Sequence, residues 1–283
     1  MKNSLLKVAA EAARIVPKPL KRSLYRIKPL AALIRSLLNR AAPEGLVPTT
    51  IASGDLAGMS LNLNLKTEKD YWLGTYEVDL QVAIREFVSP GMVVYDVGAN
   101  IGYISPLLAK TVGSDGRVIC FEAHPTNLAR LKNNIELNNL DNRITIIQGA
   151  VAGDTQPVSF LIHESTSMGK VAGSSGRQEE HYHEKITVPG ITLDYFVFEQ
   201  GNPAPNAIKM DIEGGEVMAI QGMQRILNEI HPLLLIELHG EEAAKGVGEI
   251  LSAAGYQLHR MASGYATVPT IDSLDWKAYV IAK

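Results

Sequence analysis

The stretch VVYDVGANIGYIS, residues 93–105, carries the pattern that decides the expected fold. Its first residues are mostly apolar and predict a buried strand over 92–98. The glycines at 98 and 102 predict a tight turn, and the apolar spacing after them predicts a helix over 101–112. The spacing differs from G-x-G-x-x-G, which is typical of dinucleotide-binding turns, so we expect this turn to hold a different ligand.

Strands and helices alternate through most of the chain. Further strands are expected at 117–123, 144–151, 206–212, 232–239, 256–261 and 277–283, and helices at 77–88, 126–140, 216–230 and 241–255. Most of the strands are nearly continuous apolar runs, which predict a parallel sheet covered by helices on both faces. In such α/β sheets, ligands bind beyond the carboxyl ends of the strands.

The charge divides the chain into two parts. Residues 1–43 carry ten Lys or Arg and one acidic residue, whereas the remainder carries 17 basic and 29 acidic residues. We therefore expect a basic N-terminal arm over 1–45 and one domain over 46–283. The arm has apolar positions on one helical face, namely Leu30, Leu33, Ile34, Leu37 and Leu38. Membrane or partner binding, packing on its own domain, and a cleaved organelle presequence remain open for it.

The composition excludes several classes of protein. The single cysteine, Cys120, excludes a disulfide framework and a cysteine-built zinc site. We expect no transmembrane helix, because no run of eighteen apolar residues occurs, and no secretory signal, because the N-terminus lacks an apolar h-region. We expect a cytoplasmic protein with peripheral membrane contact as one role of the arm. The acidic body disfavours nucleic acid as a partner.

Acidic residues stand where the first two strands end. Asp96 precedes the turn, and Glu122 ends the next strand 26 residues later. Glu122 has the place of an acid that binds ribose hydroxyls. Asp96 would repel a pyrophosphate and attract an amino group, and N–H groups at the start of the following helix would bind a carboxylate. These features favour S-adenosylmethionine (SAM), although the turn could also be only a tight link between strand and helix.

Two later strand ends supply acids and a histidine. The segment IKMDIEGGE contains Asp211 and Glu213, and IELHG contains Glu237 and His239. Each pair projects to one side of an extended chain, so the four side chains can converge if the strands are neighbours. His239 is then a candidate general base, or the four residues are candidate ligands of Mg²⁺ or Mn²⁺. The structural alternative is that Glu213 or Glu216 caps the next helix.

The segments VVYDVGANIGYIS, IKMDIEGGE and PLLLIELHG together resemble the FkbM family of SAM-dependent methyltransferases. The resemblance covers about residues 74–260. It implies a seven-stranded, Rossmann-like class I methyltransferase sheet and O-methylation of a hydroxyl on a sugar, glycan or other small molecule. It also implies a set of residues at the SAM site: Asp96, Gly98, Asn100, Gly102, Glu122, Gln148 and Ala150.

Two other functions remain open at this stage. One is a non-catalytic protein of the same fold that is tethered by its basic arm, and the other is a nicotinamide-dependent oxidoreductase. Asp96, at the place of the first glycine of the dinucleotide pattern, disfavours the oxidoreductase. The polar insert over 165–184 is rich in glycine and serine, and we expect a flexible lid there.

The membrane role of the arm can be tested by flotation with anionic liposomes. Each Lys or Arg near such a surface contributes roughly 1 kcal/mol, so the full chain should float, and less so at high salt. A truncated chain that begins at Leu46 should stay unbound and still bind SAM. Equal flotation of the two chains would refute the membrane role, and loss of folding in the shorter one would favour packing of the arm on its domain.

Overall fold

The computed structural model describes residues 11–12, 15, 36, 38–165, 168–270, 274 and 277–283. It divides into two compact units, Met1–Val78 and Asp79–Lys283. Leu30, Leu33, Ile34 and Leu37 lie outside the described residues, so the helical face of the arm and the division after residue 45 stay predictions. Among the described residues, no helix combines the length and the apolar character needed to cross a membrane.

The first unit contains a β-hairpin followed by a short helix. Strand β1 (Val47–Thr50) pairs antiparallel with β2 (Ser60–Leu63), and helix α4 (Lys69–Leu73) follows. Leu61 and Leu63 of β2 are fully buried. Helix α4 ends at Gly74, whose left-handed conformation is typical of a helix C-terminus.

The second unit contains the predicted α/β sheet, which has seven strands. In spatial order they are β13 (Leu258–Arg260), β14 (Lys277–Ala282), β12 (Leu233–His239), β11 (Ala207–Met210), β3 (Val93–Val97), β4 (Arg117–Glu122) and β5 (Ile144–Gln148). The five strands from β12 to β5 are parallel, and β14 is antiparallel to both of its neighbours. The chain builds outward from β3 to β5 and then returns to place β11 on the other side of β3. This is the switch point of strand order, where such sheets bind ligands.

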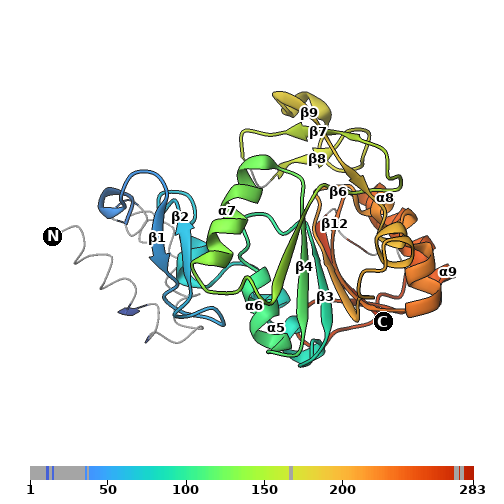
Figure 1. The fold of residues 1–283 in the computed structure, drawn as a ribbon, viewed down its shortest axis with the longest axis horizontal. Coiled ribbons are helices and arrows are strands. Elements are labelled where there is room, and N and C mark those ends of the chain that lie inside the picture. Colours follow the sequence, from blue (N-terminus) through green and yellow to red (C-terminus); the bar gives the residue numbers. More distant parts are fainter. Residues whose placement is uncertain are drawn as a thin grey trace. The chain divides into compact units, whose positions relative to one another are not determined.

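Helices cover both faces of the sheet, as predicted. Helices α6 (Ser105–Val112) and α7 (Pro125–Glu136) lie on one side, and α8 (Glu216–Gln221) and α9 (Glu241–Ala253) lie on the other (Figure 1). Helix α5 (Val78–Phe87) precedes β3.

Two of these helices differ from the prediction. Helix α6 begins at Ser105 rather than at residue 101, because the preceding residues form the turn. The helix expected over 216–230 is interrupted at Gly222, where a Cβ atom would lie 2.2 Å from the Ala152 carbonyl oxygen. It resumes and ends as a π-helical turn, η4 (Ile226–Ile230).

An aromatic cluster forms part of the core beside the central strands. Tyr95 of β3, Phe121 of β4 and Phe196 of the π-helical turn η3 (Tyr195–Glu199) are buried, with ring centroids 5.2 to 5.9 Å apart. The Tyr95 hydroxyl donates to the Pro203 carbonyl oxygen at 2.6 Å, which satisfies its polar atom. This packing fixes the strands whose carboxyl ends carry the acidic residues.

Two smaller sheets complete the second unit. Strand β6 (Ala150–Val151) pairs with β10 (Gly190–Ile191), and β7 (Val158–Ile162) lies between β8 (Lys170–Val171) and β9 (Glu184–Val188). The insert expected to be a flexible lid therefore contains a strand, β8, and a short helix, η2 (Glu179–His181).

Candidate active site

A cavity that is partly open to solvent lies at the carboxyl ends of β3, β4 and β11. Its walls come from these strand ends and from the small sheet that contains β7 and β8. It is lined by Val97, Gly98, Asn100, Phe121, Glu122, Ala123, His124, Asn127, Gly149, Ala150, Val151, Phe160, Gly169, Val171, Asp211, Ile212, Glu213 and Gly215.

Asp96 is fully buried and is not among the residues that line the cavity. One carboxylate oxygen lies 3.1 Å from Lys209 Nζ, and the other accepts a hydrogen bond from Ser105 Oγ at 2.7 Å. Lys209 Nζ also donates to the Gly98 carbonyl oxygen at 2.8 Å. The structure thus places Asp96 behind the turn, where it holds the turn in position rather than facing a ligand.

Gly98 lines the cavity, but the protein's own backbone already requires a glycine there. Its φ is +78°, and a Cβ atom would lie 1.9 Å from the Asp211 carbonyl oxygen. Gly102 also has φ +78°, and its Cβ would meet Leu131 of α7 at 2.6 Å. Gly102 is not part of the cavity wall, and its role in the structure is to let α7 approach the turn.

The N–H groups of the turn are bonded within the protein. Those of Gly98 and Ala99 both donate to the Phe121 carbonyl oxygen at 3.0 Å, and that of Asn100 donates to Glu122 at 2.7 Å. These three N–H groups are therefore used within the protein, and the binding of an anionic part of the ligand by N–H groups at the start of the following helix stays a prediction.

Glu122 presents a buried carboxylate to the cavity. Its oxygens accept the N–H groups of Asn100 and His124, each at 2.7 Å. Burial raises the pKa of Glu122 to about 7, although the two hydrogen bonds and the charge of Lys209 act in the opposite direction. A ligand whose hydroxyl groups donate to this carboxylate would favour its charged form.

His124 lines the same wall and was not expected from the sequence. Its Nδ1 accepts the Thr126 N–H at 3.2 Å as the N-cap of α7, so the ring carries its proton on Nε2. Within the described part of the chain, His124 Nε2 and Asn100 Oδ1 are buried without a hydrogen-bond partner. The cavity therefore offers a ligand one unused donor and one unused acceptor.

The structure places one of the two predicted adenine contacts at the cavity and the other away from it. Ala150 lines the cavity, together with its neighbour Gly149. Gln148 is exposed at the end of β5 and is not part of the wall. Its role at the cofactor remains only a prediction from the family resemblance.

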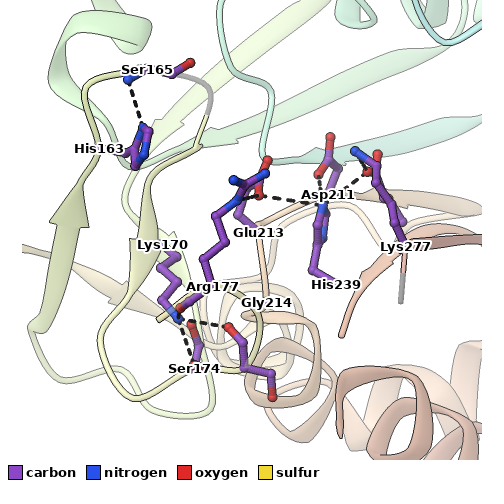
Figure 2. A network of polar contacts seen from close by, with 12 residues as sticks. His163, Ser165, Lys170, Ser174, Arg177, Asp211, Glu213, Gly214, His239 and Lys277 are labelled. Carbon is purple, nitrogen blue, oxygen red and sulfur yellow. Dashed lines mark hydrogen bonds and ion pairs between the residues drawn. The ribbon is translucent and has the colours of Figure 1, made fainter. Parts of the chain in front are cut away.

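The acids and the histidine of the later strand ends converge, as expected from neighbouring strands. His239 at the end of β12 is buried, with Nδ1 3.0 Å from Glu216 Oε1 and Nε2 3.1 Å from Glu237 Oε1. His239 Nε2 also lies 3.9 Å from Asp211 Oδ1 and 3.7 Å from Glu213 Oε2. Asp211 and Glu213 line the cavity, so they connect it to His239 (Figure 2).

The turn that carries Glu213 has an unusual backbone conformation. Glu213 has φ +54°, an uncommon left-handed conformation for a residue other than glycine, asparagine or aspartate. The next residue, Gly214, donates its N–H to Glu216 at 3.1 Å. Such strained positions cluster at functional sites.

Burial lowers the pKa of His239, but hydrogen bonds to Glu216 and Glu237 and the charge of Asp211 outweigh it and raise the pKa to about 10. The ring is therefore protonated at neutral pH in this arrangement and would have to lose that proton before acting as a base. Ligand atoms of Asp211, Glu237 and His239 lie within 4.8 Å of one another, a spacing that could hold a metal ion.

Three partners of this group were missed by the sequence analysis or given another role. Glu216, considered only as a helix cap, is completely buried against His239. Lys277 of β14 forms an ion pair with Glu237, and Arg177 Nε of the insert lies 3.9 Å from Glu213 Oε2. Lys277 and Arg177 are far from the motifs along the chain, so no local pattern indicated them.

Comparison with known families identifies the fold around this cavity. The model of the FkbM methyltransferase domain matches residues 96–258, which include the end of β3 and all of β4, β11 and β12. The chain belongs to the FkbM methyltransferase family. It is therefore a SAM-dependent methyltransferase, and the match disfavours the nicotinamide-dependent oxidoreductase that the sequence had left open.

Individual proteins are more distantly similar to this FkbM chain. The hexuronic acid methyltransferase AglP of Haloferax volcanii is 25% identical over 178 residues, which cover 63% of this chain and 69% of AglP. A solved FkbM methyltransferase from Methylobacillus flagellatus has 21% identity and a TM-score of 0.48 over 77% of this chain and 53% of its own. Aeropyrum pernix fibrillarin, solved with SAM, has 10% identity and a TM-score of 0.42 over 72% of each chain.

The pKa of Glu122 predicts that SAM binding depends on pH. If the ribose hydroxyls donate to Glu122, the ionised form binds better, so affinity should fall by up to tenfold per unit as the pH drops below about 7. The Glu122→Gln variant cannot titrate at this position and should bind more weakly at about pH 8, with a flatter profile below pH 7. Calorimetry measures both profiles, and titration of SAM itself affects them equally. Parallel profiles in the two proteins would contradict the role of Glu122.

Proposed function

We propose that this FkbM methyltransferase transfers the methyl group of SAM to a hydroxyl oxygen of a sugar. The observation that carries the proposal is the group of His239, Asp211, Glu213 and Glu237 at the cavity. A sugar hydroxyl is a very weak acid, so its oxygen becomes a good nucleophile only when a base or a metal ion helps to remove the proton. Bound SAM supplies an electrophilic methyl group.

The two halves of the cavity suit the two reactants. On the side of β3 and β4, Glu122, Asn100 and His124 offer polar groups for the ribose and adenine of SAM. On the side of β11, Asp211 and Glu213 face the space left for the acceptor. Gly98 brings the two sides together, because its Cα packs directly on the Asp211 carbonyl. Close placement of acceptor and methyl donor is a large part of catalysis of this kind.

We propose that Asp211, Glu237 and His239 hold a Mg²⁺ or Mn²⁺ ion that lowers the pKa of the acceptor hydroxyl. The position of Glu216 supports this, because a carboxylate bonded to His239 Nδ1 leaves Nε2 directed at Asp211 and Glu237. Metal-bound histidines are commonly oriented by a carboxylate in this way. The alternative is that His239 acts as the general base without a metal, once it has lost its proton.

A sugar acceptor is supported by the similarity to AglP, which is a hexuronic acid methyltransferase. The charges in the cavity also favour a sugar over a nucleic acid as the acceptor. Glu122, Asp211 and Glu213 line it and would repel the phosphates of a nucleic acid. A glycan or small molecule is therefore the proposed acceptor.

The metal can be tested by direct binding and by activity. Wild-type protein should bind Mn²⁺ in calorimetry, and Asp211→Asn should weaken that binding at least tenfold, because it removes one charged ligand. Asp141→Asn, a change at an exposed loop residue, is the matched control and should bind Mn²⁺ normally. Methyl transfer to p-nitrophenyl glucuronide, followed as S-adenosylhomocysteine release, should stop with chelator and recover with Mg²⁺ or Mn²⁺.

Full activity in chelator, with no Mn²⁺ binding, would refute the metal and leave the general-base scheme. In that case His239→Ala should lower turnover on the order of 10²–10⁴-fold while SAM affinity is retained. SAM binding without transfer to any hydroxyl acceptor would instead favour the non-catalytic alternative.

A further inference from the structure

The insert between β7 and β9 is organised around one buried lysine. Lys170 is only 2% exposed, and its Nζ donates to the carbonyl oxygens of Ser174, Ser175 and Arg177 at 3.0, 3.0 and 2.6 Å (Figure 2). Three acceptors use all three N–H bonds of an ammonium group. These bonds hold residues 170–177 in a defined loop, and the flexible lid expected over 165–184 stays a prediction.

This loop packs on the turn that carries Glu213. A Cβ atom on Gly214 would lie 2.0 Å from the Ser175 carbonyl oxygen, and one on Gly176 would lie 3.0 Å from the Glu213 carbonyl oxygen. The loop and the turn thus meet backbone to backbone, and the contact tolerates no side chain at Gly214. Because Glu213 lines the cavity, the loop is part of the surroundings of the acceptor.

Arg177 extends from this loop towards Glu213, as Figure 2 shows. The ion pair between them is long, with 3.9 Å from Nε to Oε2, and 39% of the Arg177 side chain is exposed. Arg177 Nε is itself buried without a hydrogen-bond partner among the described residues. The guanidinium therefore has donors available beside the cavity, and its planar fork matches a carboxylate.

Tyr182, five residues further along the insert, offers a second donor. Its hydroxyl is buried and, within the described part of the chain, has no hydrogen-bond partner. Burial and the charge of Glu213 raise its pKa to about 12, against the effect of Arg177, so the hydroxyl keeps its proton. The Lys170 ammonium, which holds the loop of Arg177, lies 5.8 Å from the centre of the Tyr182 ring, so the phenol stands beside the same loop.

We propose that Arg177 and Tyr182 form a subsite for the carboxylate of a uronic acid acceptor. The proposal rests on the proposed sugar methyltransferase function and names its substrate class. A cavity lined by Glu122, Asp211 and Glu213 would repel an anionic sugar unless a cation received its carboxylate. Lys277 is ion-paired with Glu237, whereas Arg177 is held only loosely. Lys170 acts as a positioning residue, since it fixes the loop that presents Arg177.

Calorimetry with two matched sugars tests the subsite without requiring turnover. Protein saturated with S-adenosylhomocysteine is titrated with p-nitrophenyl glucuronide and with p-nitrophenyl glucoside, which lacks the carboxylate. Wild type should bind the glucuronide at least tenfold more tightly. Arg177→Met should abolish this preference, Arg177→Lys should retain only part of it, and Tyr182→Phe should reduce it severalfold. Arg117→Met, at the exposed amino end of β4, is the control and should behave as wild type.

Equal affinity of the wild type for the two sugars, or an unchanged preference in Arg177→Met, would overturn the subsite. Failure of the proposed function can be distinguished from failure of the subsite. A preference for the glucuronide without methyl transfer to any hydroxyl would leave the subsite standing and refute O-methylation. Methylation of both sugars with equal kcat/KM would support O-methylation and refute the subsite.

Discussion

The buried ion pair between Asp96 and Lys209 is the interaction on which the rest of the site depends. The two residues are direct neighbours in register on β3 and β11, the strands on either side of the switch point. Lys209 also holds the Gly98 carbonyl, and Ser105 at the start of α6 donates to Asp96. Two charges removed from water are costly unless they pair well, so this contact strongly favours one arrangement of the turn.

The position of the turn then decides the position of both reactants. Gly98 packs on the Asp211 carbonyl, and the N–H of Asn100 holds Glu122. The end of β11 therefore cannot move without moving the cofactor side of the cavity. The same strand end leads into Glu213 and Gly214, which pack on the loop around Lys170. One continuous set of contacts, several of them between backbone atoms, connects the proposed cofactor groups, the acidic group at His239 and the proposed carboxylate subsite.

The sequence predicted what depends on local pattern. Apolar runs between amphipathic helices were sufficient to predict the sheet. The rule that parallel strands end at one edge was sufficient to predict that Asp211 and His239 lie close together. It did not predict that Asp96 faces Lys209, because which side of a turn an acid faces depends on a strand more than a hundred residues away. Lys277 was missed for the same reason, since β14 joins the sheet only through tertiary pairing. The insert looked flexible by composition, and its sequence did not indicate that Lys170 would bond three carbonyl oxygens of its own loop.

The most direct test of this account is SAM affinity in a double-mutant cycle of Asp96→Asn and Lys209→Met, measured by calorimetry on variants whose near-ultraviolet circular dichroism shows a folded domain. If the ion pair positions the turn, each single change should weaken SAM binding at least tenfold, which is about 1.4 kcal/mol. The double variant should then bind SAM no more weakly than the single variant with the lower affinity, because both changes remove the same contact. Wild-type affinity in a folded Lys209→Met protein, or losses that simply add in the double variant, would contradict the account.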